Sequence, residues 1–157
     1  MNDKIMHSLE KSINLLKDEI NCINNDNEIK DKFELFKKIG DCINWIYMAI
    51  ERINSEHLSM DDKKIISAFR GAANVQKHFQ NFNGFEKFIN CSRFPFSLPA
   101  ILGDKPSITW QELDLNVINN KSQIKIFNEI LANKEIIDTI YNVYEIINKY
   151  EGEDSNE

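Results

Sequence analysis

The sequence predicts an all-α protein, folded as an up-and-down bundle of four to five helices. Apolar residues recur at spacings of three and four over most of the chain, and clusters of turn-forming residues separate these stretches. Hydrophobic residues make up 42% and charged residues 28%, a balance typical of a globular protein. The 157 residues therefore predict a single helical domain over 1–150, followed by a disordered acidic tail over 151–157.

The first two helices are predicted from their apolar stripes. In residues 4–23 one stripe contains Leu9, Ile13, Leu16, Ile20 and Ile23, and it stops at the short polar residues 24–27, which favour a turn. Residues 33–53 have a similar stripe and a second apolar strip beside it, made of Leu35, Cys42, Trp45 and Ala49. A helix that is apolar on most of its circumference is expected at the centre of the bundle or in a subunit interface.

A third helix is predicted from Ser59, its N-cap, to about Phe79, with acidic residues in its first turn. An irregular Pro/Phe-rich arm should follow over 80–118, because Pro95 and Pro99 exclude an ordinary helix there. Its aromatic residues are expected to pack on the bundle, with a short strand pair near 94–102 and 107–110. Residues 121–150 then predict one long helix or two shorter ones, with an interruption at Ala132 and Asn133.

Composition restricts the function classes. The net charge of -6 disfavours general coating of nucleic acid, although basic residues outnumber acidic ones between Lys63 and Arg93. Three widely spaced cysteines predict reduced thiols, and neither a metal site nor a cofactor is expected. No apolar run is long enough to span a membrane and the N-terminus lacks the features of a signal peptide, so a cytoplasmic protein without membrane contact is expected.

One polar row on the third helix carries the candidate chemistry. Arg70, Asn74 and His78 are four residues apart and therefore share one slowly turning face, which is expected to meet solvent or a partner. Arginine binds phosphate, and histidine exchanges protons near neutral pH. The asparagine amide can orient a bound group, and Lys77 adds a cation. The alternative interpretation is a solvated helix face with a histidine favoured by the helix dipole.

The segment that runs from Ile65 to Phe79, then through Phe94-Pro95-Phe96-Ser97-Leu98-Pro99 to Trp110, resembles small bacterial proteins of the HEPN superfamily, including abortive-infection proteins. The resemblance implies a four- to five-helix bundle, a homodimer, and a metal-independent ribonuclease acting in phage defence or as a toxin of a toxin–antitoxin pair. His78 would then be the general acid/base, Asn74 the polar residue four positions before it, and either Arg70 or Lys77 the cation for the phosphorane charge.

The spacing differs from the HEPN pattern, in which four to six residues separate the Arg from the His. Seven residues separate Arg70 from His78, and Ala73 stands where an Arg would lie. Two functions from different classes therefore stay open. The first is a ribonuclease whose basic cleft includes Lys77, Lys63 and Lys64. The second is a noncatalytic HEPN-like module that binds RNA, a nucleotide or a protein partner, the last through Trp45 and Phe96.

Overall fold

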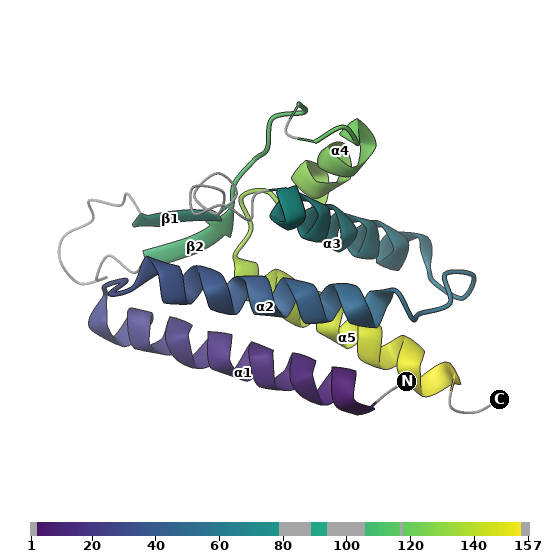
Figure 1. Ribbon diagram of the computed structural model, residues 1–157, viewed down its shortest axis with the longest axis horizontal. Coiled ribbons are helices and arrows are strands. Elements are labelled where there is room, and N and C mark those ends of the chain that lie inside the picture. The colour runs from purple at the N-terminus through teal and green to yellow at the C-terminus, as the bar shows by residue number, and fades with distance from the viewer. Residues whose placement is uncertain (1–2, 79–88, 94–105, 117, 155–157) are drawn as a thin grey trace.

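The structure of the protein is a computed structural model that describes residues 3–78, 89–93, 106–116 and 118–154. Within these ranges the chain forms the helices α1 (Asp3–Asp26), α2 (Lys32–Ile50), α3 (Met60–His78), α4 (Lys121–Ile130) and α5 (Ile136–Asp154) and the strands β1 (Ile89–Arg93) and β2 (Pro106–Trp110). The predicted all-α class and the helical bundle are confirmed. The first three helices alternate in direction, and α1 begins at the end of the bundle where α5 ends (Figure 1).

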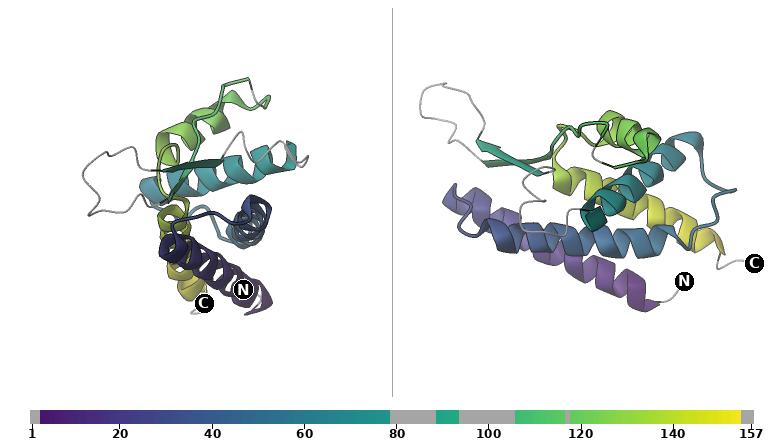
Figure 2. Two further views of the ribbon diagram at one scale, coloured as in Figure 1. Left: turned by 90° about the vertical axis from the view of Figure 1, so that its left-hand side faces the viewer. Right: turned by 45° about the horizontal axis from the view of Figure 1, so that its top comes forward.

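The centre of the bundle is α2, as its two apolar strips predicted. Figure 2 shows α2 between α1 on one side and α3 on the other, with α4 outermost beyond α3. In the second strip Leu35, Cys42 and Ala49 are fully inaccessible, whereas Trp45 is half-buried. Most of this strip therefore serves the protomer's own core. Across the α1–α2 contact, Lys38 Nζ lies 2.6 Å from Glu19 Oε2, and this hydrogen bond raises the lysine pKa.

The predicted turns and caps at the helix ends are present. Asn27 adopts a left-handed conformation with φ 52° directly after α1, where the cluster of short polar residues predicted a turn. Ser59 caps α3, because its Oγ accepts a hydrogen bond from the Asp62 N–H at 3.1 Å. The last helical stretch is divided into α4 and α5 near the expected interruption, and Asn133 is left-handed there with φ 63°.

The strands pair in antiparallel fashion, with Ile89 opposite Trp110 and Arg93 opposite Pro106. The second predicted strand is confirmed, but the first lies earlier in the chain than expected; the expected range 94–102 falls outside the described residues. The reason is burial: the earlier segment brings Ile89, only 3% exposed, opposite the buried Trp110. β2 also bonds on its other edge, where Trp110 N–H donates to Lys134 O and Trp110 O accepts from Asn133 N–H.

Trp110 joins the strand pair to three helices. Its side chain is fully buried and meets the rings of Phe69 on α3 and Phe127 on α4 edge to face, at centroid distances of 6.1 and 5.7 Å. Its indole Nε1 donates to Thr139 Oγ1 on α5 at 2.9 Å. The aromatic residues of the segment 80–118 were expected to pack on the bundle, and this is confirmed for Trp110.

The C-terminal boundary differs from the expected one. α5 continues through Asp154, beyond the predicted end of the domain at 150. Extending an existing helix by a few residues costs little, because the nucleation step has already been taken. Glu151 is the first residue of this extension, and its side chain is half-buried.

Candidate functional site

The predicted polar row lies on α3, but its three members have different surroundings. Arg70 is half-exposed, and its Nε donates a hydrogen bond to Glu51 Oε1 at 2.9 Å. Glu51 is the C-cap of α2, where its carboxylate stands at the negative end of the helix dipole. Arg70 offsets this charge through one edge of its guanidinium. No other polar contact of Arg70 occurs in the described part of the chain.

The middle of the row is covered by α4, contrary to the expectation that the whole face meets solvent or a partner. Asn74 is half-buried, and its Nδ2 donates to Gln123 Oε1 on α4 at 3.0 Å. One turn before it, Gly71 allows the close approach, since a Cβ there would stand 3.3 Å from the Gln123 carbonyl oxygen. The close neighbour engages the Asn74 amide and so removes it from the candidate site.

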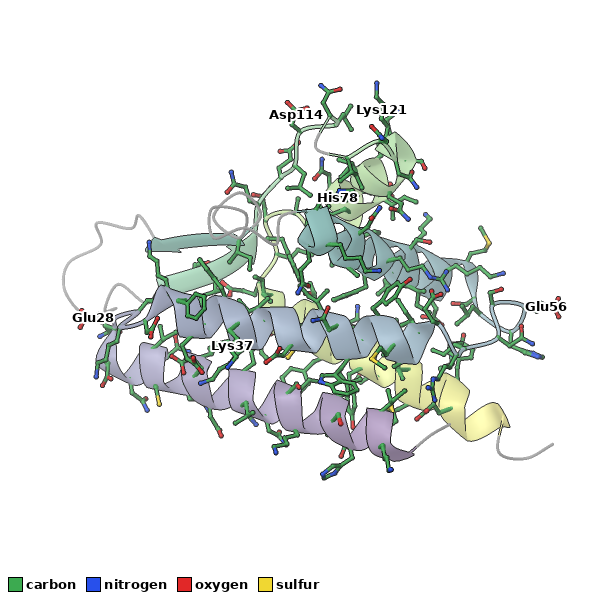
Figure 3. All side chains as sticks on the ribbon, viewed as in Figure 1. Glu28, Lys37, Glu56, His78, Asp114 and Lys121 are labelled. Atoms are coloured by element: carbon green, nitrogen blue, oxygen red, sulfur yellow. The ribbon has the colours of Figure 1, made fainter. Side chains whose placement is uncertain are left out.

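His78 is exposed at the far end of the row. Figure 3 shows it at the C-terminal end of α3, whereas Glu56 lies in the loop that precedes the N-terminal end of this helix. At a rise of about 1.5 Å per residue, Arg70 and His78 are separated by about 12 Å along the axis. One protomer therefore does not bring the predicted acid/base and the predicted cation to the same phosphate.

A shallow groove at the N-terminal end of α3 contains two of the predicted residues. Its volume is about 370 Å³, and Lys63 and Arg70 line it together with Ser55, Glu56, Leu58, Ile66 and Ser67. We call it the α3 groove. It offers two cations and two hydroxyl groups, which are donors for a phosphate oxygen. Sequence reasoning missed Ser55, because only the fold brings the loop over 51–59 beside α3.

The predicted cations of α3 fall on two faces. Lys63, Arg70 and Lys77 are seven residues apart, and seven steps of 100° return to within about 20° of the same direction, so they form one line. We call them the α3 cationic row. Lys77 continues the row beyond the groove, with its Nζ 4.4 Å from the centroid of the half-buried Tyr47 ring on α2. Lys64 is exposed on another face and does not line the groove.

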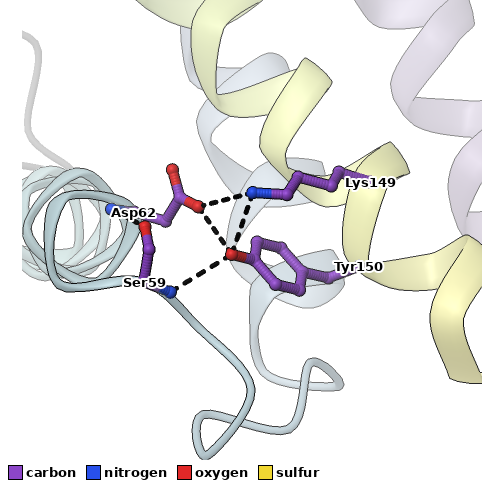
Figure 4. Close-up of polar contacts among 4 residues, drawn as sticks. All are labelled: Ser59, Asp62, Lys149 and Tyr150. Atoms are coloured by element: carbon purple, nitrogen blue, oxygen red, sulfur yellow. Dashed lines mark hydrogen bonds and ion pairs between the residues drawn. The ribbon is translucent and has the colours of Figure 1, made fainter.

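A four-residue network fixes the N-terminal end of α3 against α5 (Figure 4). The Tyr150 hydroxyl donates to Asp62 Oδ2 at 2.6 Å and accepts from the Ser59 N–H at 3.2 Å, and Lys149 Nζ lies 3.3 Å from the same carboxylate oxygen. Burial opposes ionisation of Asp62, but the hydrogen bonds from Tyr150, Ser59 and Lys149 outweigh it and lower the carboxyl pKa. This network holds the helix turn that carries Lys63.

Of the two residues predicted for a protein interface, the structure describes Trp45. Trp45 is half-buried against the core on α2, so part of its indole reaches the surface. Phe96 lies outside the described residues. Trp45 is not among the residues that line the α3 groove.

The described residues hold no group of three potential metal ligands. Cys22 and Cys42 are free thiols, and burial raises the pKa of the Cys42 thiol to about 12, which keeps it protonated and unreactive at neutral pH. None of the helices in the described ranges combines the length and the apolar character required to cross a membrane.

The chain matches no protein-family model, no curated protein and no solved structure. The functional argument therefore rests on the geometry of α3 and its neighbours.

Proposed function

We propose that this protein is a noncatalytic RNA-binding module that holds a phosphodiester backbone along the α3 cationic row. The observation that carries the proposal is the alignment of Lys63, Arg70 and Lys77 on one face of α3, with the first two lining a common groove. The HEPN-like character of the bundle, its homodimeric state and a cytoplasmic location belong to the same proposal.

The chemistry of the row suits phosphate better than a base edge. Lys63 has no side-chain partner in the described part of the chain, and Arg70 uses only its Nε, so the terminal guanidinium nitrogens can bind phosphate oxygens. Neighbouring cations are separated by about 10.5 Å along the helix, a distance that more than one nucleotide must span. Such contacts position a strand without reading its sequence.

The lack of convergence in one protomer favours binding over cleavage. Asn74 is engaged by Gln123, and His78 lies about 12 Å from Arg70 along the axis. In-line attack by a 2′-hydroxyl requires the acid/base and the stabilising cation at one phosphate. These residues do not meet that requirement within one protomer.

A ribonuclease of a bacterial defence or toxin system is the second candidate, and one observation favours it. His78 is exposed next to Lys77, with no hydrogen-bond partner in the described part of the chain. In a homodimer that paired the C-terminal ends of two α3 helices, each His78 would meet a cation of the other protomer. That arrangement would supply the acid/base and the charge stabilisation from two chains.

RNA binding is tested by fluorescence anisotropy with a labelled single-stranded RNA in EDTA, over a series of salt concentrations. We expect Lys63→Gln and Lys77→Gln each to weaken binding severalfold and to reduce the salt slope by about one, because each removes one phosphate contact. Lys17→Gln, which removes an exposed lysine from α1, is the matched control and should change neither quantity by as much. Equal losses in all three variants, or no binding by the wild type, would overturn the proposal.

The same RNA distinguishes the second candidate. Gel analysis of wild type and His78→Ala should show intact RNA in both if the protein only binds. Fragments with 2′,3′-cyclic phosphate ends from the wild type alone would establish the metal-independent ribonuclease instead.

A further inference from the structure

A second groove lies on a different side of α3, where α3 meets the end of α4 and the start of α5. Its volume is about 440 Å³, within the range of roughly 300–1,000 Å³ typical of small-molecule sites. The residues that line it are Ile65, Phe69, Ile130, Leu131, Lys134, Glu135, Asp138, Thr139 and Asn142. We call it the α5 groove. It shares no lining residue with the α3 groove.

The inner surface of the α5 groove is apolar. The half-buried Ile65 and Ile130 supply its accessible apolar surface, and Phe69 and Leu131, each 1% exposed, complete the apolar part of its lining. Such a surface gains free energy when an aromatic or branched apolar group displaces water from it. The polar residues of the groove come from the segment that joins α4 to α5 and from α5 itself.

The charge of the α5 groove is net negative, since Glu135 and Asp138 face the single cation Lys134. The Glu135 carboxylate is occupied: it accepts from Ser107 Oγ at 2.7 Å and from the Ile108 N–H at 3.4 Å. Asp138 and Asn142 are one turn apart on α5, exposed, and without a hydrogen-bond partner in the described ranges. They leave a carboxylate and an amide oxygen free to accept hydrogen bonds beside an apolar surface.

We propose that the α5 groove binds a small organic cation, a primary amine attached to an aromatic or branched apolar group. The apolar group lies against Ile65 and Ile130, and the ammonium donates to the Asp138 carboxylate and the Asn142 amide oxygen. Lys134 covers the apolar group with its aliphatic stem and keeps its own ammonium in water. Charge complementarity excludes the matching carboxylic acid, because its anion would face two carboxylates.

Trp110 provides a local readout, because it lies directly behind the groove. Phe69 and Thr139 line the groove on one side and contact the buried indole on the other, the first ring edge to face and the second through the Nε1–H to Oγ1 hydrogen bond. A ligand that moves either residue changes the surroundings of Trp110. Trp45→Phe leaves Trp110 as the sole tryptophan, since the chain contains only two.

The probe is 2-phenylethylamine, titrated into Trp45→Phe protein while heat of binding and tryptophan emission are recorded. 3-Phenylpropionate, of similar shape and opposite charge, is the ligand control. We expect the amine alone to bind and to shift the emission of Trp110, with the affinity reduced about tenfold in Asp138→Asn, because one charged hydrogen bond is lost. Asp114→Asn, which removes an exposed carboxylate outside the groove, is the matched protein control and should bind as the parent does.

Three results would overturn the proposal. The first is no measurable heat at millimolar amine, and the second is equal binding of the amine and the acid. The third is amine binding that is as strong in Asp138→Asn as in the parent and does not shift the emission of Trp110. Circular dichroism of Asp138→Asn separates a lost ligand contact from a lost fold. None of these results bears on RNA binding at the α3 cationic row, so the two proposals fail independently.

Discussion

The two ends of α3 are held in opposite ways. At its N-terminal end, Ser59 caps the helix and Asp62 is bonded to Tyr150 and Lys149 of α5, so the turn that carries Lys63 has a fixed place in the bundle. At its C-terminal end, Lys77 and His78 are exposed and the second has no partner in the described part of the chain. The predicted acid/base His78 lies at the free end, while the predicted cations Lys63 and Arg70 line the groove toward the fixed end.

This difference separates two requirements of a site. Binding needs cations held in place before the ligand arrives, because ordering long side chains on contact costs conformational entropy. Acid/base catalysis further needs the histidine at the same atom as those cations. The fixed end of α3 meets the first requirement, and the free end meets the second only if another protomer completes it.

The largest expected effect comes from the residue of β2 that packs against the middle of α3. Trp110→Ala removes a fully buried indole between Phe69, Phe127 and Thr139. The free energy of unfolding should fall by about 3–5 kcal/mol, through lost burial and the cavity left behind. Urea denaturation followed by circular dichroism measures it. A loss below about 1 kcal/mol would mean that the strand pair does not anchor α3.

Tyr150→Phe should loosen the fixed end. It removes the hydroxyl that bonds to Asp62, Ser59 and Lys149, and leaves a carboxylate only 16% exposed without its shortest partner. We expect a loss of about 1–3 kcal/mol in the free energy of unfolding and weaker RNA binding, because the turn of Lys63 is no longer held. Tyr141→Phe, at a half-buried tyrosine of α5, is the control. Equal effects of the two variants would contradict the anchoring role.

The pH dependence of stability should identify the same network. The pKa of Asp62 is lowered in the folded protein relative to its ordinary value of 3.8, so the ionised carboxylate stabilises the fold. That stabilisation is complete above the ordinary value and is lost as the pH falls through the lower, folded-state pKa. The difference in unfolding free energy between wild type and Asp62→Asn should therefore be constant from pH 7 to 5 and shrink in more acidic solution. A constant difference down to pH 2 would argue against the lowered pKa.

Glu51→Gln should strengthen phosphate binding at the α3 groove. Its carboxylate neutralises Arg70 through the 2.9 Å contact, so it opposes a phosphate at the α3 groove. We expect RNA affinity to rise severalfold at low salt, with a steeper salt dependence, because one more cation is available to the backbone. Anisotropy titration against the Lys17→Gln control tests it. An unchanged or lower affinity would mean that Glu51 positions Arg70 rather than competing for it.

The smallest expected effect on stability is at the free end. His78→Ala should change the free energy of unfolding by less than about 0.5 kcal/mol, since the side chain is exposed and has no hydrogen-bond partner among the described residues. Thermal unfolding measures it. A larger loss would show that His78 has a structural contact, and the cleavage assay would then need a second variant to separate folding from catalysis.

Much of the fold follows from local sequence. The stripes of Leu9 and Leu16, the cap at Ser59 and the turns at Asn27 and Asn133 depend on neighbours within a few residues, so spacing and residue type predict them. The strand pair was harder to predict: its first strand is stabilised by pairing with residues far along the chain, and the prediction placed it too late.

The helices and the shared face of Arg70, Asn74 and His78 could be predicted from residue spacing, because each depends on periodicity along one helix. The packing of the helices sets which cations of α3 share a groove, that Glu51 neutralises Arg70, and that Gln123 engages Asn74. These partners come from other elements, and no spacing within α3 specifies them. The hydrogen bonds of a side chain and the net charge around it depend on what packs against it, which is a property of the assembled bundle.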